Sequence, residues 1–273
     1  MSPRSNSAVT IGAYDGLHLG HRSVIRQLCS LAREEGLESV VVTFDPHPAS
    51  VVRPGSAPLQ LTDLPQRLEL LHATGVDKVL VLDFTPERAA ESAEDFVDEV
   101  IVGDLGARLV LVGRDFHFGR NRGGNVELLE KMGETRGFEV IPFDLVADAS
   151  GEVVSSTRIR RLVAEGALVR AAALLGRTYE VRGLVVSEAA AHAGAGEGRA
   201  AVSVEIPPGI LLPPPGGYLG RAGLVGAGSL PLARCQVVVP PEHRAVAVLG
   251  VNTAWPAGSP VRVLVERARA NPG

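Results

Sequence analysis

Apolar runs alternate with amphipathic segments from residue 8 to about residue 143. Runs that are apolar throughout predict buried strands, which lie near 8–12, 38–44, 77–83, 108–113 and 138–143. Between them, apolar residues recur with helical period near 21–35, 62–74, 91–102 and 124–136. Strands without polar alternation are typical of a parallel sheet that helices cover on both faces. The pattern therefore predicts an α/β fold with a doubly wound parallel sheet.

The pattern changes after residue 155. A helical pair is predicted near 156–164 and 167–175, and from Gly176 onward the chain is rich in Gly and Pro and contains neither Lys nor Asp. Short β-like runs follow at 179–186, 200–205, 233–239, 246–251 and 261–266. The stretches 189–198 and 211–217 are predicted to be loops. We therefore predict two domains, an α/β domain over 1–175 and a small all-β barrel over 176–273.

Composition narrows the classes of partner. The chain has 273 residues, is 45% hydrophobic and carries a formal net charge of -4, with no long basic run, which argues against nucleic acid. Cys29 and Cys235 lie too far apart in sequence for a disulfide framework or a cysteine metal site. No run of apolar residues is long enough to span a membrane, so we expect a cytoplasmic protein that does not bind membranes. The sequence predicts no oligomeric state.

The strongest candidate site is the stretch GAYDGLHLGH at residues 12–21, between the first predicted strand and helix. A strand that ends in glycines before a helix directs backbone N–H groups and the positive end of the helix dipole at one place. His18 and His21 add side-chain donors, and Gly20 leaves room for a phosphate. H-x-G-H alone is a weak signal, but its position between strand and helix favours a triphosphate-binding site.

Two further segments follow predicted strands. In TFDPHP, at residues 43–48, two prolines predict a rigid extended turn, which either forms a pocket wall or simply ends the strand. The segment 112–124 combines Phe116 and Phe118 with three arginines and flanking glycines. It is interpreted as a flexible basic loop that stacks on a planar ring and contacts a phosphate, or as a solvated loop with two anchoring phenylalanines.

A fourth segment, VSSTRIRR at residues 154–161, begins a predicted helix. Ser or Thr at this place predicts a helix cap. Arg158, Arg160 and Arg161 in the first turn oppose the helix dipole, which is unfavourable unless an anion lies among them. The segment therefore predicts a bound anion.

In this order the four segments resemble the FMN adenylyltransferase half of bacterial bifunctional riboflavin kinase/FAD synthetases, over residues 9 to about 176. They are similar to that family's G-x-F-D-G-x-H-x-G-H, T-F-x-P-H-P, G-x-D-F-x-F-G…R-x-G and S-S-T-x-I-R motifs. Tyr14 stands in the phenylalanine place and His117 where an arginine is more usual. The resemblance implies a Rossmann-like nucleotidyltransferase domain that converts FMN and ATP into FAD and pyrophosphate.

The resemblance also implies roles for individual residues. The implied catalytic residues are His18, His21, Asp15 and Arg160. Those implied to contact ATP are Gly12, Tyr14, Gly20, Ser156 and Thr157. Those implied to contact FMN are Phe44, Pro46, His47, Pro48, Asp115, Phe116, Phe118 and Arg122. Mg²⁺ is expected to clamp the phosphates without a dedicated protein metal site. Because the FMN phosphate is already ionised, the reaction needs positioning and charge stabilisation rather than a strong base.

The second domain resembles the family's riboflavin kinase barrel only in part. Residues 176–183 and 211–218 are similar to its beginning and to its L-L-P…G-V-Y strand. The family's G-R-x-x-G-F-P-T-A-N motif is replaced by 187–199, and the strand expected to carry the catalytic glutamate, 244–249, contains no acid. We therefore expect a degenerate barrel without riboflavin kinase activity. Three alternatives stay open: another phosphorylated, flavin-like acceptor, a catalytically idle flavin or nucleotide sensor, and a kinase that uses a replaced motif, with Glu205 its nearest candidate base.

Overall fold

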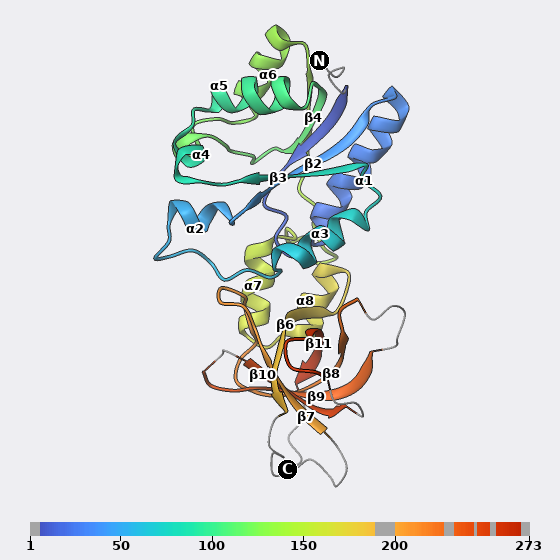
Figure 1. Ribbon diagram of the computed structural model, residues 1–273. Coiled ribbons are helices and arrows are strands. Elements are labelled where there is room, and N and C mark those ends of the chain that lie inside the picture. The colour runs from blue at the N-terminus through green and yellow to red at the C-terminus, as the bar shows by residue number, and fades with distance from the viewer. Residues whose placement is uncertain (1–5, 189–199, 227–231, 243–244, 252–254, 269–273) are drawn as a thin grey trace. The chain divides into compact units, whose positions relative to one another are not determined.

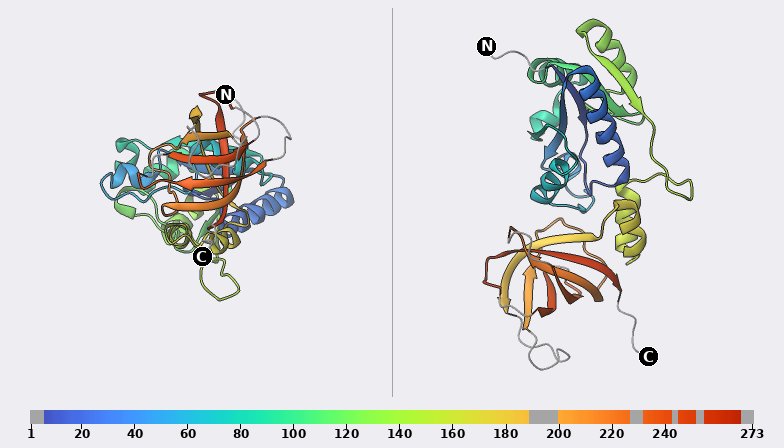
Figure 2. Two further views of the ribbon diagram at one scale, coloured as in Figure 1. Left: turned by 90° about the horizontal axis from the view of Figure 1, so that it is seen from below. Right: turned by 90° about the vertical axis from the view of Figure 1, so that its right-hand side faces the viewer.

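The computed structural model describes residues 6–188, 200–226, 232–242, 245–251 and 255–268. The chain divides into two compact units, each built on its own sheet (Figures 1 and 2). The first unit comprises residues 1–58 and 67–154, and the second comprises 59–66 and 155–273. Within the described residues, no helix combines the length and the apolar character needed to cross a membrane.

The first unit contains a five-stranded sheet in the order β3-β2-β1-β4-β5. Its strands are β1 (Ser7–Ile11), β2 (Glu38–Asp45), β3 (Lys78–Asp83), β4 (Ala107–Gly113) and β5 (Glu139–Phe143). Every neighbouring pair is parallel. The strand order reverses direction at β1, between β2 and β4, and ligands bind such sheets beyond the carboxyl ends of the strands at this point. The predicted doubly wound parallel sheet is confirmed.

Helices cover both faces of this sheet, as the uniformly apolar strands predict. They are α1 (Leu19–Glu35), α2 (Pro48–Val52), α3 (Leu64–His72), α4 (Pro86–Ala90), α5 (Ala93–Phe96), the π-helix η1 (Val97–Asp104), the 3₁₀ turn η2 (Arg120–Arg122) and α6 (Val126–Arg136). Consecutive residues of β1 enter different cores: Ala8 packs with Ile25 and Leu28 of α1, and Val9 with Val97 of η1 and Leu129 of α6. Figure 1 shows α1 on one side of the sheet and α5 and α6 on the other.

Two details differ from the predictions. The helix predicted near 91–102 begins two residues later, because Glu91 is extended and ends α4, after which Ser92 caps α5 and the backbone continues into η1. The extended turn predicted through Pro48 is also too long. His47 caps α2 and Pro48 occupies its first turn, where a missing N–H and a fixed φ cost nothing.

The second unit contains α7 (Ser156–Ala164), α8 (Leu168–Leu175) and a closed barrel in the order β10-β7-β6-β11-β8-β9. The strands are β6 (Tyr179–Glu188), β7 (Ala200–Glu205), β8 (Gly216–Leu224), β9 (Ala233–Val239), β10 (Ala245–Val251) and β11 (Pro260–Ala268). Among the described residues, neighbouring strands of the barrel pair antiparallel. The predicted small all-β barrel is thus confirmed.

One predicted loop in this unit is wrong. Gly216 and Gly217 are the first two residues of β8 and pair with Val239 and Val238, so the loop predicted over 211–217 ends before Gly216. A glycine is required further along this strand, at Gly220, where a Cβ would collide with the backbone oxygen of Leu264. The other predicted loop, 189–198, lies outside the described residues. The domain division at residue 175, which rests on composition, stays a prediction.

Candidate active site

The segment 12–21 connects β1 to α1 at the carboxyl end of the central strand. Its turn places Tyr14, Gly16 and Leu17 in the left-handed region, with φ of 50°, 80° and 33°. Left-handed residues other than glycine cost about 1–2 kcal/mol each, so packing must hold them. Tyr14 and Leu17 supply it, since both are buried in the core under α1.

This turn brings His18 and His21 together. Their rings stack with centroids 3.6 Å apart and planes at 18°. His18 also caps α1, because its Nδ1 accepts the backbone N–H of His21 at 3.3 Å. An accepting Nδ1 assigns the proton of a neutral His18 ring to Nε2, which is then a donor. The predicted histidine pair is therefore a single stacked unit at the positive end of a 17-residue helix.

Two glycines of this segment lie close to aromatic rings, Gly20 to His18 and Gly12 to Tyr14. A Cβ at Gly20 would lie 3.1 Å from Cε1 and Nδ1 of His18, and a Cβ at Gly12 would lie 3.2 Å from Cε2 of Tyr14. The sequence predicts that Gly20 leaves room for a phosphate. The structure adds a second reason for glycine at this position, because a side chain here would press on the His18 ring.

Tyr14 packs against the histidine pair. Its ring meets His21 edge-on, with centroids 5.1 Å apart, and its hydroxyl forms a 2.8 Å hydrogen bond with Thr10 Oγ1. Burial raises the pKa of the Tyr14 phenol, so the side chain is neutral in this position. Asp15 is equally buried, with 1% of its surface exposed. The contacts with ATP implied for Gly12, Tyr14 and Gly20 stay predictions.

The second segment lies at the end of β2. Phe44 packs edge-on against Phe84, and His47 Nδ1 accepts the backbone N–H of Ala49 at 3.1 Å, which fixes the ring at the start of α2. Thr43 Oγ1 donates to the backbone oxygen of Ala13 at 3.2 Å. The structure thus brings the second segment to the first. The roles of Phe44, Pro46, His47 and Pro48 with FMN stay predictions.

Sequence reasoning missed Arg67, which joins these two segments. Its side chain is fully buried, Nη1 donates to the Ala13 oxygen at 3.2 Å, and Nη2 donates to the Phe44 oxygen at 2.8 Å. Nη2 also lies 3.8 Å from Asp45. Fully buried arginines are rare and are held by specific partners. The available signal was its helical spacing, because Arg67 falls four residues before Leu71, a core residue of the same helix.

The third segment, which was predicted to be a loop, contains a closed turn. Phe118 and Gly124 exchange backbone hydrogen bonds of 3.1 and 2.9 Å, which close the residues between them into a ring. Phe116 stacks on Phe118 at 5.4 Å, and Phe118 lies 5.8 Å from Phe96 of α5. Both rings are partly buried against the core. Two residues of the implied FMN set are exposed in this segment, Asp115 before the turn and Arg122 within it.

The fourth segment begins α7 in the second unit. The predicted cap is confirmed at Ser155, whose Oγ accepts the Arg158 N–H at 3.3 Å. Thr157 is exposed and Ser156 half-buried, and Arg160 Nε donates to the Leu59 oxygen at 2.8 Å. Because the histidine pair belongs to the first unit, the ATP contacts of Ser156, Thr157 and Arg160 stay predictions.

The chain is similar in sequence to several known proteins. The relatives include the bifunctional riboflavin kinase/FMN adenylyltransferases of Escherichia coli (strain K12), 35% identical over 185 residues, and of Pseudomonas fluorescens, 38% identical over 177 residues. These alignments cover 68% and 65% of this chain but only 59% and 56% of the relatives. A similar enzyme of the same description from Buchnera aphidicola subsp. Acyrthosiphon pisum is 32% identical over 182 residues, which are 67% of this chain and 58% of that protein.

A solved structure and a family model complete the comparison. The crystal structure of a macrolide-efflux protein from Streptococcus pneumoniae is similar, with a TM-score of 0.79 and 25% identity over 97% of this chain and 86% of that chain. The family model described as FAD synthetase matches residues 1–158. Since that match includes β1 to β5 and the histidine pair and extends over more than half of the sequence, the chain belongs to the FAD synthetase family.

Proposed function

We propose that the chain transfers AMP from ATP to FMN, giving FAD and pyrophosphate. The observation that carries this proposal is the stacked pair of His18 and His21 at the start of α1, at the carboxyl end of the central strand. The family supports the same reaction, because relatives of this chain are described as FMN adenylyltransferases.

In the proposed reaction an oxygen of the FMN phosphate attacks the α-phosphorus of ATP. A new P–O bond forms, the bond from the α-phosphorus to the bridging oxygen breaks, and pyrophosphate leaves with that electron pair. The nucleophile is already ionised, so the protein has to position it and stabilise developing charge. Nε2–H of His18 and the positive end of α1 supply that stabilisation, and His21 extends it.

We assign the β- and γ-phosphates to the start of α7. Arg158, Arg160 and Arg161 lie in its first turns, where cations oppose the helix dipole and an anion relieves them. Ser156 and Thr157 offer hydroxyl groups at the same helix end. Arg160 Nε donates to the Leu59 oxygen, and this hydrogen bond orients the guanidinium group.

The flavin is assigned to the second and third segments. Phe44 and residues 46–48 form one wall, and Asp115 and, in the closed turn, Arg122 are exposed on the third segment. Phe116 and Phe118 give this turn its apolar base. Arg67 supports the proposal because it ties the flavin wall to the histidine turn through the oxygens of Phe44 and Ala13.

Magnesium is proposed to enter with the substrate as the ATP complex. Among the described residues, no three His, Cys, Asp or Glu side chains are grouped so that they could hold a metal ion. Mg²⁺ keeps several waters and commonly binds through substrate phosphates with one or two carboxylates. Asp15 is the carboxylate of the histidine turn, and it either orients that turn or contacts the ion.

We further propose that riboflavin is not phosphorylated. The stretch 244–249, where the family's catalytic glutamate is expected, contains no acid, and Glu205 is an exposed residue at the end of β7. Most of the stretch that replaces the P-T-A-N motif, 187–199, lies outside the described residues.

The test uses the purified full chain with Mg²⁺ and ATP. FMN and riboflavin are offered separately, and the products are identified by chromatography with mass spectrometry. We expect FAD and pyrophosphate from FMN. A chain that binds FMN but forms no FAD would contradict the proposal and favour a sensor, and pyrophosphate release with a different phosphorylated acceptor would replace FMN as the substrate.

A further inference from the structure

The closed turn from Phe118 to Gly124 is seated on Ala93, the first residue of α5. A Cβ at Gly119 would lie 2.7 Å from the backbone N and Cα of Ala93, and a Cβ at Gly124 would lie 2.6 Å from the Ala93 Cβ. Distances this short leave no room for a side chain. The two glycines therefore allow the turn to pack directly against α5.

One backbone hydrogen bond fixes the tip of the turn to the same region. The N–H of Arg120 donates to the Glu91 oxygen at 2.7 Å. The next two residues, Asn121 and Arg122, have φ of 54° and 59°. Two consecutive left-handed residues other than glycine are unfavourable, and such strain persists only where the surroundings hold it. The hydrogen bond from the Arg120 N–H to the Glu91 oxygen lies directly before these two residues in the chain.

Glu91 is itself held between two capped helices. Thr85 Oγ1 accepts the N–H of Arg88 at the start of α4, and Ser92 Oγ accepts the N–H of Asp95 at the start of α5. Glu91 lies between them with extended backbone, at φ −65° and ψ 141°. Its carbonyl oxygen accepts the Arg120 N–H.

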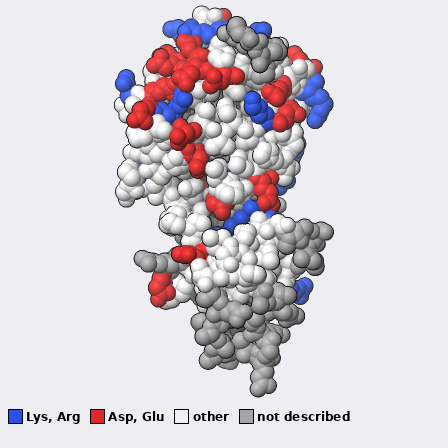
Figure 3. All heavy atoms as spheres, in the orientation of Figure 1, with Lys and Arg blue, Asp and Glu red and all other residues white. Residues whose placement is uncertain are grey.

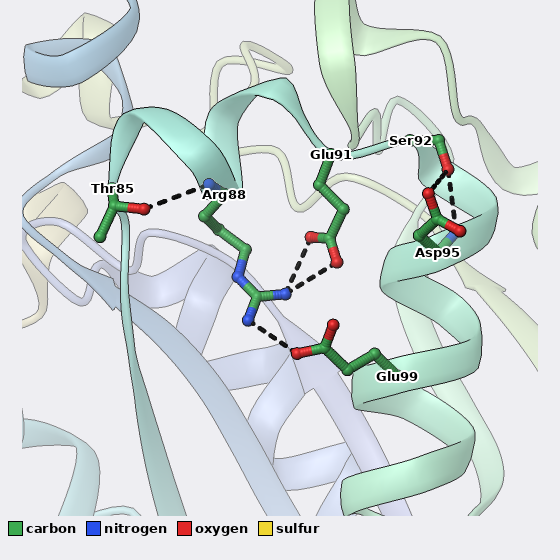
Figure 4. A network of polar contacts seen from close by, with 6 residues as sticks. All are labelled: Thr85, Arg88, Glu91, Ser92, Asp95 and Glu99. Atoms are coloured by element: carbon green, nitrogen blue, oxygen red, sulfur yellow. Dashed lines mark hydrogen bonds and ion pairs between the residues drawn. The ribbon is translucent and has the colours of Figure 1, made fainter.

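The side chain of Arg88 completes this support (Figure 4). Nη1 donates to both carboxylate oxygens of Glu91, at 2.9 and 2.8 Å, and Nη2 donates to Glu99 Oε1 at 3.1 Å. We call Arg88, Glu91 and Glu99 the Arg88 bridge. The Arg88 and Glu91 side chains are 22% and 12% exposed, against 63% and 81% for the pair of Arg114 and Asp144. Water therefore screens the pair of Arg88 and Glu91 less, whereas Glu99 is 59% exposed.

Carboxylates are frequent in this part of the first unit. The first turns of α5 and η1 carry Glu94, Asp95 and Asp98, and Figure 3 shows acidic side chains gathered on the outer part of this unit. Nη1 and Nη2 of Arg88 donate to Glu91 and Glu99, so they are directed at carboxylates rather than at a phosphate. The role of Arg88 is thus to hold Glu91, not to bind substrate.

We propose that Arg88 is a positioning residue for substrate binding: through Glu91 and the Arg120 N–H it sets the backbone that presents Asn121 and Arg122 to an anionic, planar substrate. This rests on the proposed function, in which the closed turn contacts FMN. Arg88 acts on the affinity for FMN and leaves the histidine pair and its use of ATP untouched.

Kinetics of the full chain test this split. Arg88→Ala should raise the KM for FMN about fivefold, the size expected for losing one coupled contact, with kcat and the KM for ATP within about twofold of wild type. Glu91→Ala should do the same, and the double variant should be no worse than either single variant, since both break one interaction. Arg88→Lys, which cannot bridge both glutamates, should fall between wild type and Arg88→Ala.

The matched control is Arg136→Ala. Arg136 donates to Asp98 at 2.9 and 3.1 Å and to Thr135 at 2.9 Å, so its hydrogen bonds lie in the same unit but run to residues outside the closed turn. It should leave the KM for FMN unchanged. Equal increases of the KM for FMN and for ATP in Arg88→Ala would indicate general loosening of the unit and would overturn the proposal, as would an unchanged KM for FMN.

Limited trypsin digestion tests the same idea without catalysis. The bonds after Arg120 and Arg122 should be cut at least about threefold faster in Arg88→Ala than in wild type or Arg136→Ala, because local opening governs cleavage. Unchanged cleavage with unchanged kinetics overturns the proposal entirely. Faster cleavage with an unchanged KM for FMN leaves the turn held by Arg88 but removes its substrate role. A wild-type chain that forms no FAD defeats the proposed function, and the digestion alone then decides whether Arg88 holds the turn.

Discussion

The ring of His18 stacks on that of His21 while its Nδ1 accepts the His21 backbone N–H, so each histidine fixes the other. His18 Nε2–H is a donor of this pair, and it lies at the end of a helix whose dipole favours anions. An anion that binds here gains from a side-chain donor and from the helix dipole at once.

His21→Ala should lower turnover of FMN to FAD by on the order of 10²–10³, the usual effect of deleting one preorganised donor to developing charge. The stacking partner of His18 is lost as well. Turnover is measured by chromatography at saturating ATP and FMN. His72→Ala is the control, because His72 is an exposed residue of the last turn of α3 and should leave turnover unchanged. Equal turnover in wild type and His21→Ala would remove His21 from the reaction.

Arg160→Ala should raise the KM for ATP or lower kcat and leave FMN binding intact, because its proposed ligand is the β/γ-phosphate group. The variant also loses the bond to the Leu59 oxygen, which costs about 1 kcal/mol of folding free energy. Quenching of flavin fluorescence reports FMN binding, and urea denaturation reports the stability loss. Arg170→Ala, which removes an exposed arginine of α8 in the same unit, is the control. Weakened FMN binding with normal use of ATP would place Arg160 at the flavin instead.

Tyr14 predicts how stability depends on alkaline pH. Because burial raises the pKa of its phenol, the folded state keeps a proton that the unfolded state releases near the ordinary value of 10.0. The contribution is fully present below pH 10, and stability then falls as the pH rises towards the folded-state pKa. Urea midpoints of wild type should drop more steeply above pH 10 than those of Tyr14→Phe. Parallel curves would show that the phenol ionises as freely in the folded chain as in the unfolded one.

Riboflavin with Mg²⁺ and ATP should yield neither FMN nor FAD. A riboflavin kinase must deprotonate or orient a neutral ribityl hydroxyl, which needs a base that the FMN phosphate does not need. FMN as substrate in a parallel reaction is the positive control. If FMN does form from riboflavin, Glu205→Gln identifies whether Glu205 is the base, and loss of the reaction in that variant would show that the barrel has kept its chemistry in residues other than the usual ones.

The sequence predicts the strands of the first unit well because each is apolar throughout, as in Val40 to Val42, and such runs have few alternatives in a two-sided sheet. The histidine turn can also be predicted from the sequence, since its pattern depends on the spacing of residues that are close together in the chain. The break at Glu91 is not, because it depends on the Ser92 cap and on contacts with a turn about 30 residues away. Local pattern does not record such contacts. Gly119 and Gly124 show the same limit, as their need for glycine comes from Ala93.

Arg67 has a consequence for how this site can diverge. It donates to the main-chain oxygens of Ala13 and Phe44, which every residue type provides, so these two hydrogen bonds do not depend on which residues occupy those positions. Substitutions at 13 and 44 can therefore change what the two segments recognise while the distance between them is kept. A change at Arg67 itself has no such freedom, because a buried cation and two backbone acceptors must be replaced together. Variation in acceptor preference is thus expected around a constant arginine.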